Sequence, residues 1–132
     1  MDIKWKYKID LTDQNVFAEI EQERNITFPN ELKEFITQAN AATPEKYNFM
    51  VGNTEKAFGA VLSFNRNEPD TDSAFTALAV IPDTNLIPFG IDPFGNYICY
   101  SLCDQKIVFW DHETNEILAV SSSLSSFLAS LY

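Results

Sequence analysis

The sequence has little of what an active site or a metal centre needs. It contains one histidine, two cysteines and four glycines in 132 residues. The phosphate-binding patterns Gly-x-x-x-x-Gly-Lys and Gly-x-Gly-x-x-Gly are absent, and so is the Gly-x-Ser-x-Gly turn of the hydrolases. The chain therefore offers no motif for nucleotide binding or for catalysis by an activated serine, and we expect no cofactor.

Long apolar runs are missing as well. A stretch such as Ala77–Ile81 is far shorter than the ~20 residues that cross a bilayer. Residues Met1–Lys4 open no apolar secretory segment. We therefore expect a cytoplasmic protein with no membrane partner.

Basic residues are scarce, and their distribution is uneven. Nine Lys and Arg face nineteen Asp and Glu, a formal net charge of -10. Residues 1–66 hold eight basic and ten acidic groups (net -2), whereas residues 67–132 hold Lys106 and nine acidic groups (net -8). Nucleic acid is excluded as a partner because phosphate contacts supply most of its affinity. A basic protein would be attracted, although acidity also serves solubility alone.

The two cysteines, Cys99 and Cys103, are four residues apart. On one strand they would stand roughly 13 Å apart at about 3.3 Å per residue, too far for a disulfide. With only His112 nearby, a four-ligand zinc site lacks donors. The spacing predicts two buried, inert thiols and no metal.

The residues that are present indicate a folded chain. Apolar residues make up 45% and aromatic residues 14%, a globular composition. The length fits one domain, residues 1–132. We expect an α+β fold: a mainly antiparallel sheet of about five or six strands, with helices packed on one face and a C-terminal helix.

Local patterns place the elements. Trp5–Leu11 alternates as a half-buried strand or an extended arm, and Thr12 or Asp13 offers an N-cap for the helix that carries Val16, Phe17 and Ile20. A proline-led helix from Phe28–Glu31 ends near Asn40. Further along, the predicted strands are Asn48–Val51, Phe58–Phe64, Leu86–Phe89, Asn96–Leu102, Ile107–Trp110 and Ile117–Val120.

Two more helices and a loop complete the expected fold. Asn65–Asp72 reads as a surface loop, and Thr71 or Asp72 offers an N-cap for a helix that carries Phe75 and Leu78 and stops at Pro82. The closing helix follows Ser121–Ser123, and its apolar face is formed by Leu124, Phe127, Leu128 and Leu131.

Candidate catalytic residues read more simply as turn residues. His112 lies in the polar string Asp111–Glu116, which is typical of a hairpin loop. Asp92 and Asp111 each follow a strand and are the carboxylate pair to consider for acid–base chemistry. The Pro, Gly and Asn content of 92–96 favours a turn at Asp92.

Four short motifs together resemble a known superfamily. In chain order they are Phe28-Pro29-x-x-Leu32-x-x-Phe35-Ile36, Leu86-Ile87-Pro88-Phe89-Gly90-x-Asp92-x-x-Gly95-Asn96-Tyr97, Val108-x-Trp110-Asp111-His112-Glu113 and Ser126-Phe127-Leu128. This order resembles the SUKH superfamily, which includes the yeast Smi/Knr regulator of cell-wall synthesis and many bacterial immunity proteins of polymorphic toxin systems. The resemblance covers roughly residues 14 to 132.

The resemblance implies a non-enzymatic immunity protein that binds a cognate toxin, such as a nuclease, and masks or distorts its active site. The acidic second half suits a cationic target of this kind. We expect the loops of 65–72, 90–95 and 111–116 to bring five acids to the binding surface: Asp70, Asp72, Asp92, Asp111 and Glu113. The motif residues read as structural, setting strand ends, turns and core: Pro29, Leu32, Phe35, Pro88, Phe89, Gly95 and Trp110.

Two other functions stay open at this point. An intracellular scaffold or regulatory interaction module of the same fold would have no toxin partner and would co-purify with housekeeping proteins. A small hydrolase would need a deep pocket around His112 or Asp92.

Overall fold

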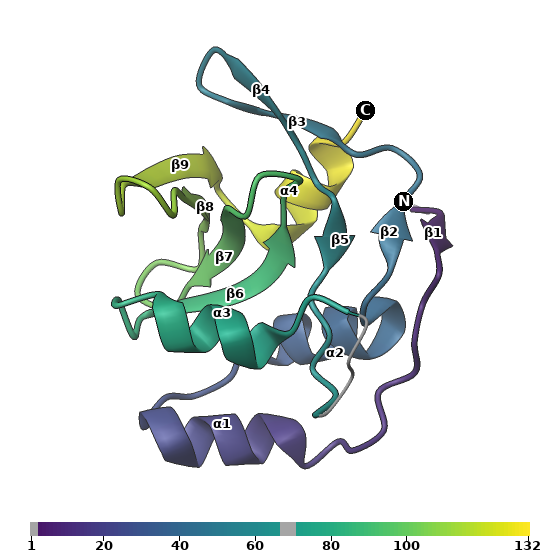
Figure 1. Ribbon diagram of the computed structural model, residues 1–132, viewed down its shortest axis with the longest axis vertical. Helices are drawn as coiled ribbons and strands as arrows, with labels where there is room; N and C mark the ends of the chain where they lie inside the picture. The colour runs from purple at the N-terminus through teal and green to yellow at the C-terminus, as the bar shows by residue number, and fades with distance from the viewer. Residues whose placement is uncertain (1–2, 67–70) are drawn as a thin grey trace.

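The computed structural model describes residues 3–66 and 71–132 (Figure 1). Four helices are seen in these ranges: α1 (Val16–Arg24), α2 (Asn30–Ala39), α3 (Ala74–Val80) and α4 (Leu124–Ser130). The main sheet contains β5 (Ala60–Val61), β6 (Leu86–Ile91), β7 (Tyr97–Ser101), β8 (Ile107–Trp110) and β9 (Ile117–Ser121), in that order. Two further two-stranded sheets pair β1 (Trp5–Lys6) with β2 (Thr43–Pro44), and β3 (Asn48–Val51) with β4 (Thr54–Ala57), the second pair being a hairpin.

All four pairings in the main sheet are antiparallel, and the predicted α+β class with a C-terminal helix is confirmed. The four meander strands follow one another through short turns, as the spacing of turn residues predicts. A register shift between Pro88 and Gly90 marks an irregularity in β6. Gly90 is needed there because a Cβ would lie 2.9 Å from the ring of Phe58.

The segment 58–64 is a strand only over Ala60–Val61, which is shorter than predicted. Consecutive N–H groups of this segment bond to different parts of the chain. The N–H of Val61 donates to the carbonyl of Ala42, and that of Leu62 donates to the carbonyl of Phe89. The segment is apolar because it is buried between elements, rather than because it runs along one neighbouring strand. The unpredicted strand β4 is mostly exposed and polar, so it lacks an alternating apolar pattern.

The first helix begins later than expected. The residue before α1 is Asn15, and neither Thr12 nor Asp13 occupies that position. The Asp13 carboxylate instead accepts the N–H of Asn15 at 2.9 Å, which closes the turn that leads into the helix. Ser123, within the predicted run Ser121–Ser123, caps α4 by accepting a backbone N–H. Ser73 caps α3 in the same way, in place of the predicted Thr71 or Asp72.

Two buried asparagines attach the N-terminal arm to the fold. Asn40 donates to the carbonyl of Ile9 at 3.0 Å and accepts the N–H of Phe64 at 2.8 Å. Asn65 accepts the N–H of Thr12 at 2.8 Å. The arm is therefore held by these side-chain bonds together with backbone bonds, among them the Ile9 N–H to the Asn40 carbonyl at 3.0 Å, and only its start forms a strand. Asn65, predicted to lie in a surface loop, is buried, and its side-chain amide group bonds to backbone groups of the arm.

The sheet has one large apolar face and one smaller one. Aromatic rings dominate the main core, where Phe49, Phe58, Phe89 and Phe127 are all fully buried and packed against one another. On the opposite face a small cluster, which we call the outer cluster, consists of Ile81, Leu86, Cys99 and Trp110. This outer cluster is the part of the fold that borders the candidate site. Within the described ranges, no helix has the length and apolar content to cross a membrane.

Candidate functional site

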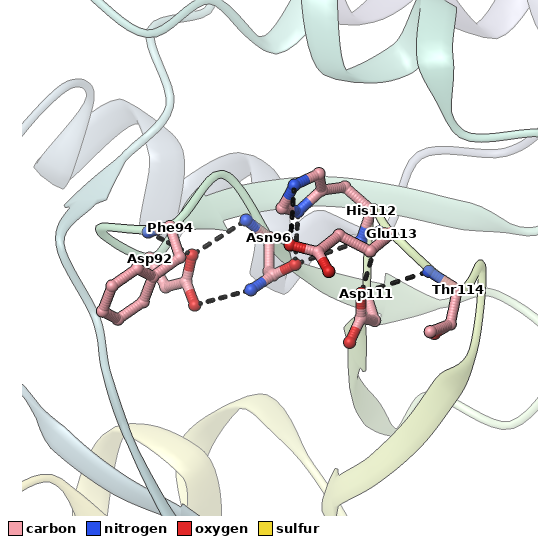
Figure 2. Close-up of polar contacts among 7 residues, drawn as sticks. All are labelled: Asp92, Phe94, Asn96, Asp111, His112, Glu113 and Thr114. Carbon is pink, nitrogen blue, oxygen red and sulfur yellow. Dashed lines mark hydrogen bonds and ion pairs between the residues drawn. The ribbon is translucent and has the colours of Figure 1, made fainter.

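Two turns meet at one end of the main sheet, and a buried carboxylate organises the first of them. In the β6–β7 turn, the Asp92 carboxylate accepts the N–H groups of Phe94 at 2.9 Å and Asn96 at 2.8 Å (Figure 2). Its second oxygen accepts the Asn96 side-chain amide at 3.0 Å. Gly95 adopts φ +86°, a conformation that glycine tolerates at no steric cost.

Asn96 links this turn to the β8–β9 turn. Its Oδ1 accepts the backbone N–H of His112 at 3.0 Å and lies 2.7 Å from the ring Nδ1 of the same residue (Figure 2). Because the Asn96 amide nitrogen donates to Asp92, its oxygen is the acceptor, and Nδ1 of His112 carries the proton. The other ring nitrogen lies 3.9 Å from a Glu113 carboxylate oxygen. The chain Asp92–Asn96–His112 therefore locks the two turns together.

The β8–β9 turn is also braced internally. The Asp111 carboxylate accepts the N–H groups of Glu113 at 2.8 Å and Thr114 at 3.3 Å. Asn115, at φ +61°, accepts the indole N–H of Trp110 at 2.6 Å. These bonds hold the turn in a single shape, so an exposed side chain on it is presented without loss of backbone freedom on binding.

Beside these turns the outer face of the sheet is hollowed into a groove of about 530 Å³. We call it the outer groove, and it is lined by Val80, Pro82, Gly95, Tyr97, Trp110, His112 and Asn115. The Tyr97 and Trp110 rings stack with their centroids 5.9 Å apart. Burial raises the pKa of Tyr97, and the nearby charge of Asp72 raises it further.

The predicted acidic residues occupy three different environments. Asp72 and Glu113 are exposed, and Asp111 is half-buried with one oxygen engaged in its own turn. Asp92 is only 4% exposed and spends both oxygens on its turn, so it does not belong to a binding surface. Asp70 lies outside the described residues. The structure thus brings Asp111 and Glu113 beside the Asp92 turn, while Asp72 lies near Tyr97.

The motif residues lie in the core and in turns. Pro29 precedes α2, Gly95 lies in the β6–β7 turn, and Trp110, the last residue of β8, bonds to Asn115 of the β8–β9 turn. The others are buried side chains: Leu32, Phe35, Pro88 and Phe89. Sequence reasoning missed the outer groove and the bond from Asn96 to His112. The only local signal for this site is the run from Asp92 to Asn96. It predicts the β6–β7 turn, but it does not predict that the β8–β9 turn lies beside it.

The cysteines are free, but only one matches the prediction. Cys99 is fully buried in the outer cluster, and burial raises the pKa of its thiol. Cys103 is exposed in the β7–β8 turn, since the strand ends at Ser101 and the chain has already left the sheet. Among the described residues, no three His, Cys, Asp or Glu side chains are grouped so that they could hold a metal ion.

This difference in burial predicts one reactive thiol in the native protein. Under native conditions at pH 8, a thiol-specific reagent should label Cys103 within minutes, and Cys99 only on the time scale of unfolding. Mass spectrometry of the folded protein should therefore show one adduct, and two in denaturant. Rapid double labelling without denaturant would contradict the burial of Cys99.

A comparison with protein families places most of the chain in a known family. The model of the SMI1 / KNR4 family (SUKH-1) matches residues 11–130. A comparison with curated proteins gives no match. The family match spans both linked turns and all four helices.

Proposed function

Because the chain belongs to the SMI1 / KNR4 (SUKH-1) family, we propose that it is a non-enzymatic immunity protein that neutralises a cognate toxin in the bacterial cytoplasm. The toxin would be a cationic protein domain, such as a nuclease whose groove binds phosphate. Binding, rather than catalysis, would be the activity: the protein occupies the toxin's working surface and excludes its substrate.

The observation that carries this proposal is the acidic, preorganised end of the main sheet. Glu113 is exposed on a turn that is held by Asp111, Asn96 and His112. Asp72 stands close enough to influence Tyr97 at the outer groove. In residues 71–132 the only basic side chain is Lys106, which lies in the β7–β8 turn.

Charge would set the rate of association with the toxin, and packing would set the rate of dissociation. Exposed carboxylates accelerate the encounter with a cationic partner, and this effect weakens as salt screens the field. A partly buried aromatic pair such as Tyr97 and Trp110 supplies the packed contact that slows dissociation. An immunity protein needs both, since it has to capture a toxin quickly and hold it.

The test uses charge reversal against a matched control. The toxin to try is the C-terminal domain of an exported protein encoded beside this gene. We expect Asp72→Lys with Glu113→Lys to raise the Kd about 30-fold at physiological salt, mostly through a slower association rate. Growth rescue by co-expression should weaken in parallel.

The control pair is Glu34→Lys with Glu45→Lys. Both residues are exposed, and the change in net charge is the same, but they lie in the less acidic half, on α2 and after β2. A control that weakens binding as much as the test pair would show that net charge alone matters and would remove the acidic end from the proposal. If no toxin gene neighbours this one and native cytosol yields only housekeeping partners, the scaffold function replaces the immunity function.

A further inference from the structure

The outer groove combines an apolar wall with hydrogen-bond acceptors. The wall includes Val80, Pro82 and the half-buried ring of Tyr97, which stacks on Trp110. Val80 is 52% exposed, so this apolar surface is open to water. Among the described residues, no lysine or arginine lines the groove. The groove can therefore take an apolar stem without displacing a positive charge of the chain itself.

The ring of His112 presents one acceptor. Because its Nδ1 donates to the Asn96 oxygen at 2.7 Å, the other nitrogen of the neutral ring, Nε2, carries a lone pair. A carboxylate oxygen of Glu113 lies 3.9 Å from Nε2 (Figure 2). This separation is too long for a hydrogen bond between the two groups, but a donor placed between them can reach both. The pair therefore suits a ligand with more than one N–H group.

Negative charge reaches the groove from two sides. Burial raises the pKa of Tyr97 and the charge of Asp72 raises it further, so the Asp72 carboxylate lies within electrostatic reach of the ring. Glu113 stands beside His112. Lys106, the only basic residue of 71–132, lies in the β7–β8 turn, at the opposite end of the sheet. A cation in the groove is therefore attracted by two carboxylates.

We propose that the outer groove binds an arginine side chain of the toxin, an inference that rests on the proposed function. The methylene stem of this arginine lies along Val80 and Pro82. Its planar guanidinium group packs against the ring of Tyr97. The N–H groups of the guanidinium donate to Nε2 of His112 and to the Glu113 carboxylate.

The chemistry of the groove favours arginine over other side chains. A guanidinium group is weakly hydrated, stacks on aromatic rings and has five N–H donors, whereas the lysine ammonium is a strongly hydrated point charge. A neutral apolar side chain would fill the groove but would leave both acceptors without a donor. Arginine alone satisfies the apolar wall, the aromatic ring and the two acceptors together.

An NMR titration with acetyl-arginine methylamide tests the groove without a toxin. The reporter is the indole N–H of Trp110, which donates to Asn115 at 2.6 Å beside the groove. The indole of Trp5, packed against Phe35 and Phe58, is an internal control. We expect the Trp110 signal to shift and saturate with a Kd of about 10 mM, because one side chain makes few contacts to offset its lost freedom. The Trp5 signal should not move. Acetyl-lysine methylamide should bind about five times more weakly, and acetyl-norleucine methylamide more weakly still.

Glu113→Gln tests the carboxylate. It removes the charge from an exposed side chain and should raise the Kd for acetyl-arginine methylamide about threefold. The control is Glu116→Gln, which changes the net charge equally at an exposed residue of the same turn that forms no ion pair with His112. The control should bind as the unchanged chain does. Equal weakening by both variants would contradict a direct contact with Glu113.

Tyr97→Leu tests the aromatic ring. It keeps an apolar side chain but removes the ring, and should weaken binding about threefold, whereas Tyr97→Phe should bind as before. The dispersion of the NMR spectrum reports whether each variant is folded. If Tyr97→Leu does not fold, the Glu113 and Glu116 pair still decides the proposal.

The outcomes separate this inference from the proposed function. Equal binding of the three compounds, or equal shifts of Trp5 and Trp110, would overturn the arginine site and leave the immunity function standing. A chain that binds arginine at Trp110 but protects no cell from the neighbouring toxin would contradict the immunity function alone. In the complex with the toxin domain, at least one toxin arginine should be protected from phenylglyoxal, and protection of none would overturn the assignment of the groove to a toxin arginine.

Discussion

Replacing Phe127 with alanine is expected to lower the free energy of unfolding by about 3 to 5 kcal/mol. The side chain is fully buried on the inner face of α4. Its ring centroid lies 5.3 Å from that of Phe49, 5.7 Å from that of Phe58 and 6.1 Å from that of Phe89. Truncation removes contacts to three separate segments at once and leaves a cavity that these rings cannot easily fill. Because native domains are stable by only about 5 to 15 kcal/mol, the variant should be partly unfolded near body temperature.

Urea unfolding followed by circular dichroism measures this loss. The midpoint should fall while the dependence on denaturant stays the same, since the surface exposed on unfolding hardly changes. The control is Leu128→Ala, the next residue of the same helix, which is half-buried and should cost about 1 kcal/mol. If both variants lowered the free energy of unfolding by the same small amount, the Phe127 side chain would not be part of the packed core.

The helices could be predicted from sequence because their signals are local. The spacing of Leu124, Phe127 and Leu131 predicts α4, and these three residues are buried in the structure. The serine at its N-terminus acts as the cap, accepting the N–H of Ser126 at 3.0 Å. The helical spacing of the apolar residues and the N-terminal cap both involve residues within one or two turns of each other. Neither depends on a distant part of the chain.

The segments predicted less well depend on distant partners. Residues 58–64 were expected to form one strand, yet the N–H groups of Ser63 and Phe64 donate to Asp72 and Asn40, outside any ladder. Their apolar character showed that the segment is buried but not what it pairs with. The late start of α1 has a similar cause, because Thr12 gives its N–H to Asn65, 53 residues away.

The candidate site shows the same division. The sequence from Asp92 to Asn96 predicts a turn, and its proline, glycine and asparagine suffice for that. It does not tell which way the carboxylate points. His112, from another turn, bonds to the Asn96 oxygen, so the Asn96 side-chain amide faces the buried carboxylate of Asp92. Asp92, predicted to lie on the binding surface, therefore stabilises the two turns, whereas Glu113 on the second turn is exposed.

Rigid turns connect this architecture to the proposed function. A binding surface on loops loses affinity when the loops must be ordered on contact. Here the carboxylate of Asp111 and the amide of Asn96 hold the β8–β9 turn before any partner arrives. The hydrogen bonds that link Asp92, Asn96 and His112 hold the turn that presents Glu113. A substitution that breaks these bonds should therefore also change the position of Glu113.

Removing the carboxylate at its centre is therefore expected to be costly: Asp92→Ala should destabilise the protein by about 3 kcal/mol. Three donors lose their acceptor, namely the N–H groups of Phe94 and Asn96 and the Asn96 side-chain amide. Asn96 is itself buried, so water cannot easily replace the lost partner. Freed from Asp92, the Asn96 amide should also rotate, and the ring N–H of His112 should then lose its fixed acceptor.

Two further variants separate this cause from a general effect of losing an acid. Asp92→Asn keeps one acceptor oxygen for the backbone N–H groups but places an NH2 group against the Asn96 side-chain amide, which is also a donor, and should cost about 2 kcal/mol. Asp83→Ala removes a carboxylate that accepts the N–H of Asn85 in an equally short contact of 2.9 Å, but in an exposed turn where water can take its place, and should cost under about 1 kcal/mol. Chemical denaturation gives the three values, and the NMR signals of the His112 ring report the link between the turns. If Asp92→Ala costs no more than Asp83→Ala and the His112 signals do not move, the two turns are held by something other than this buried carboxylate.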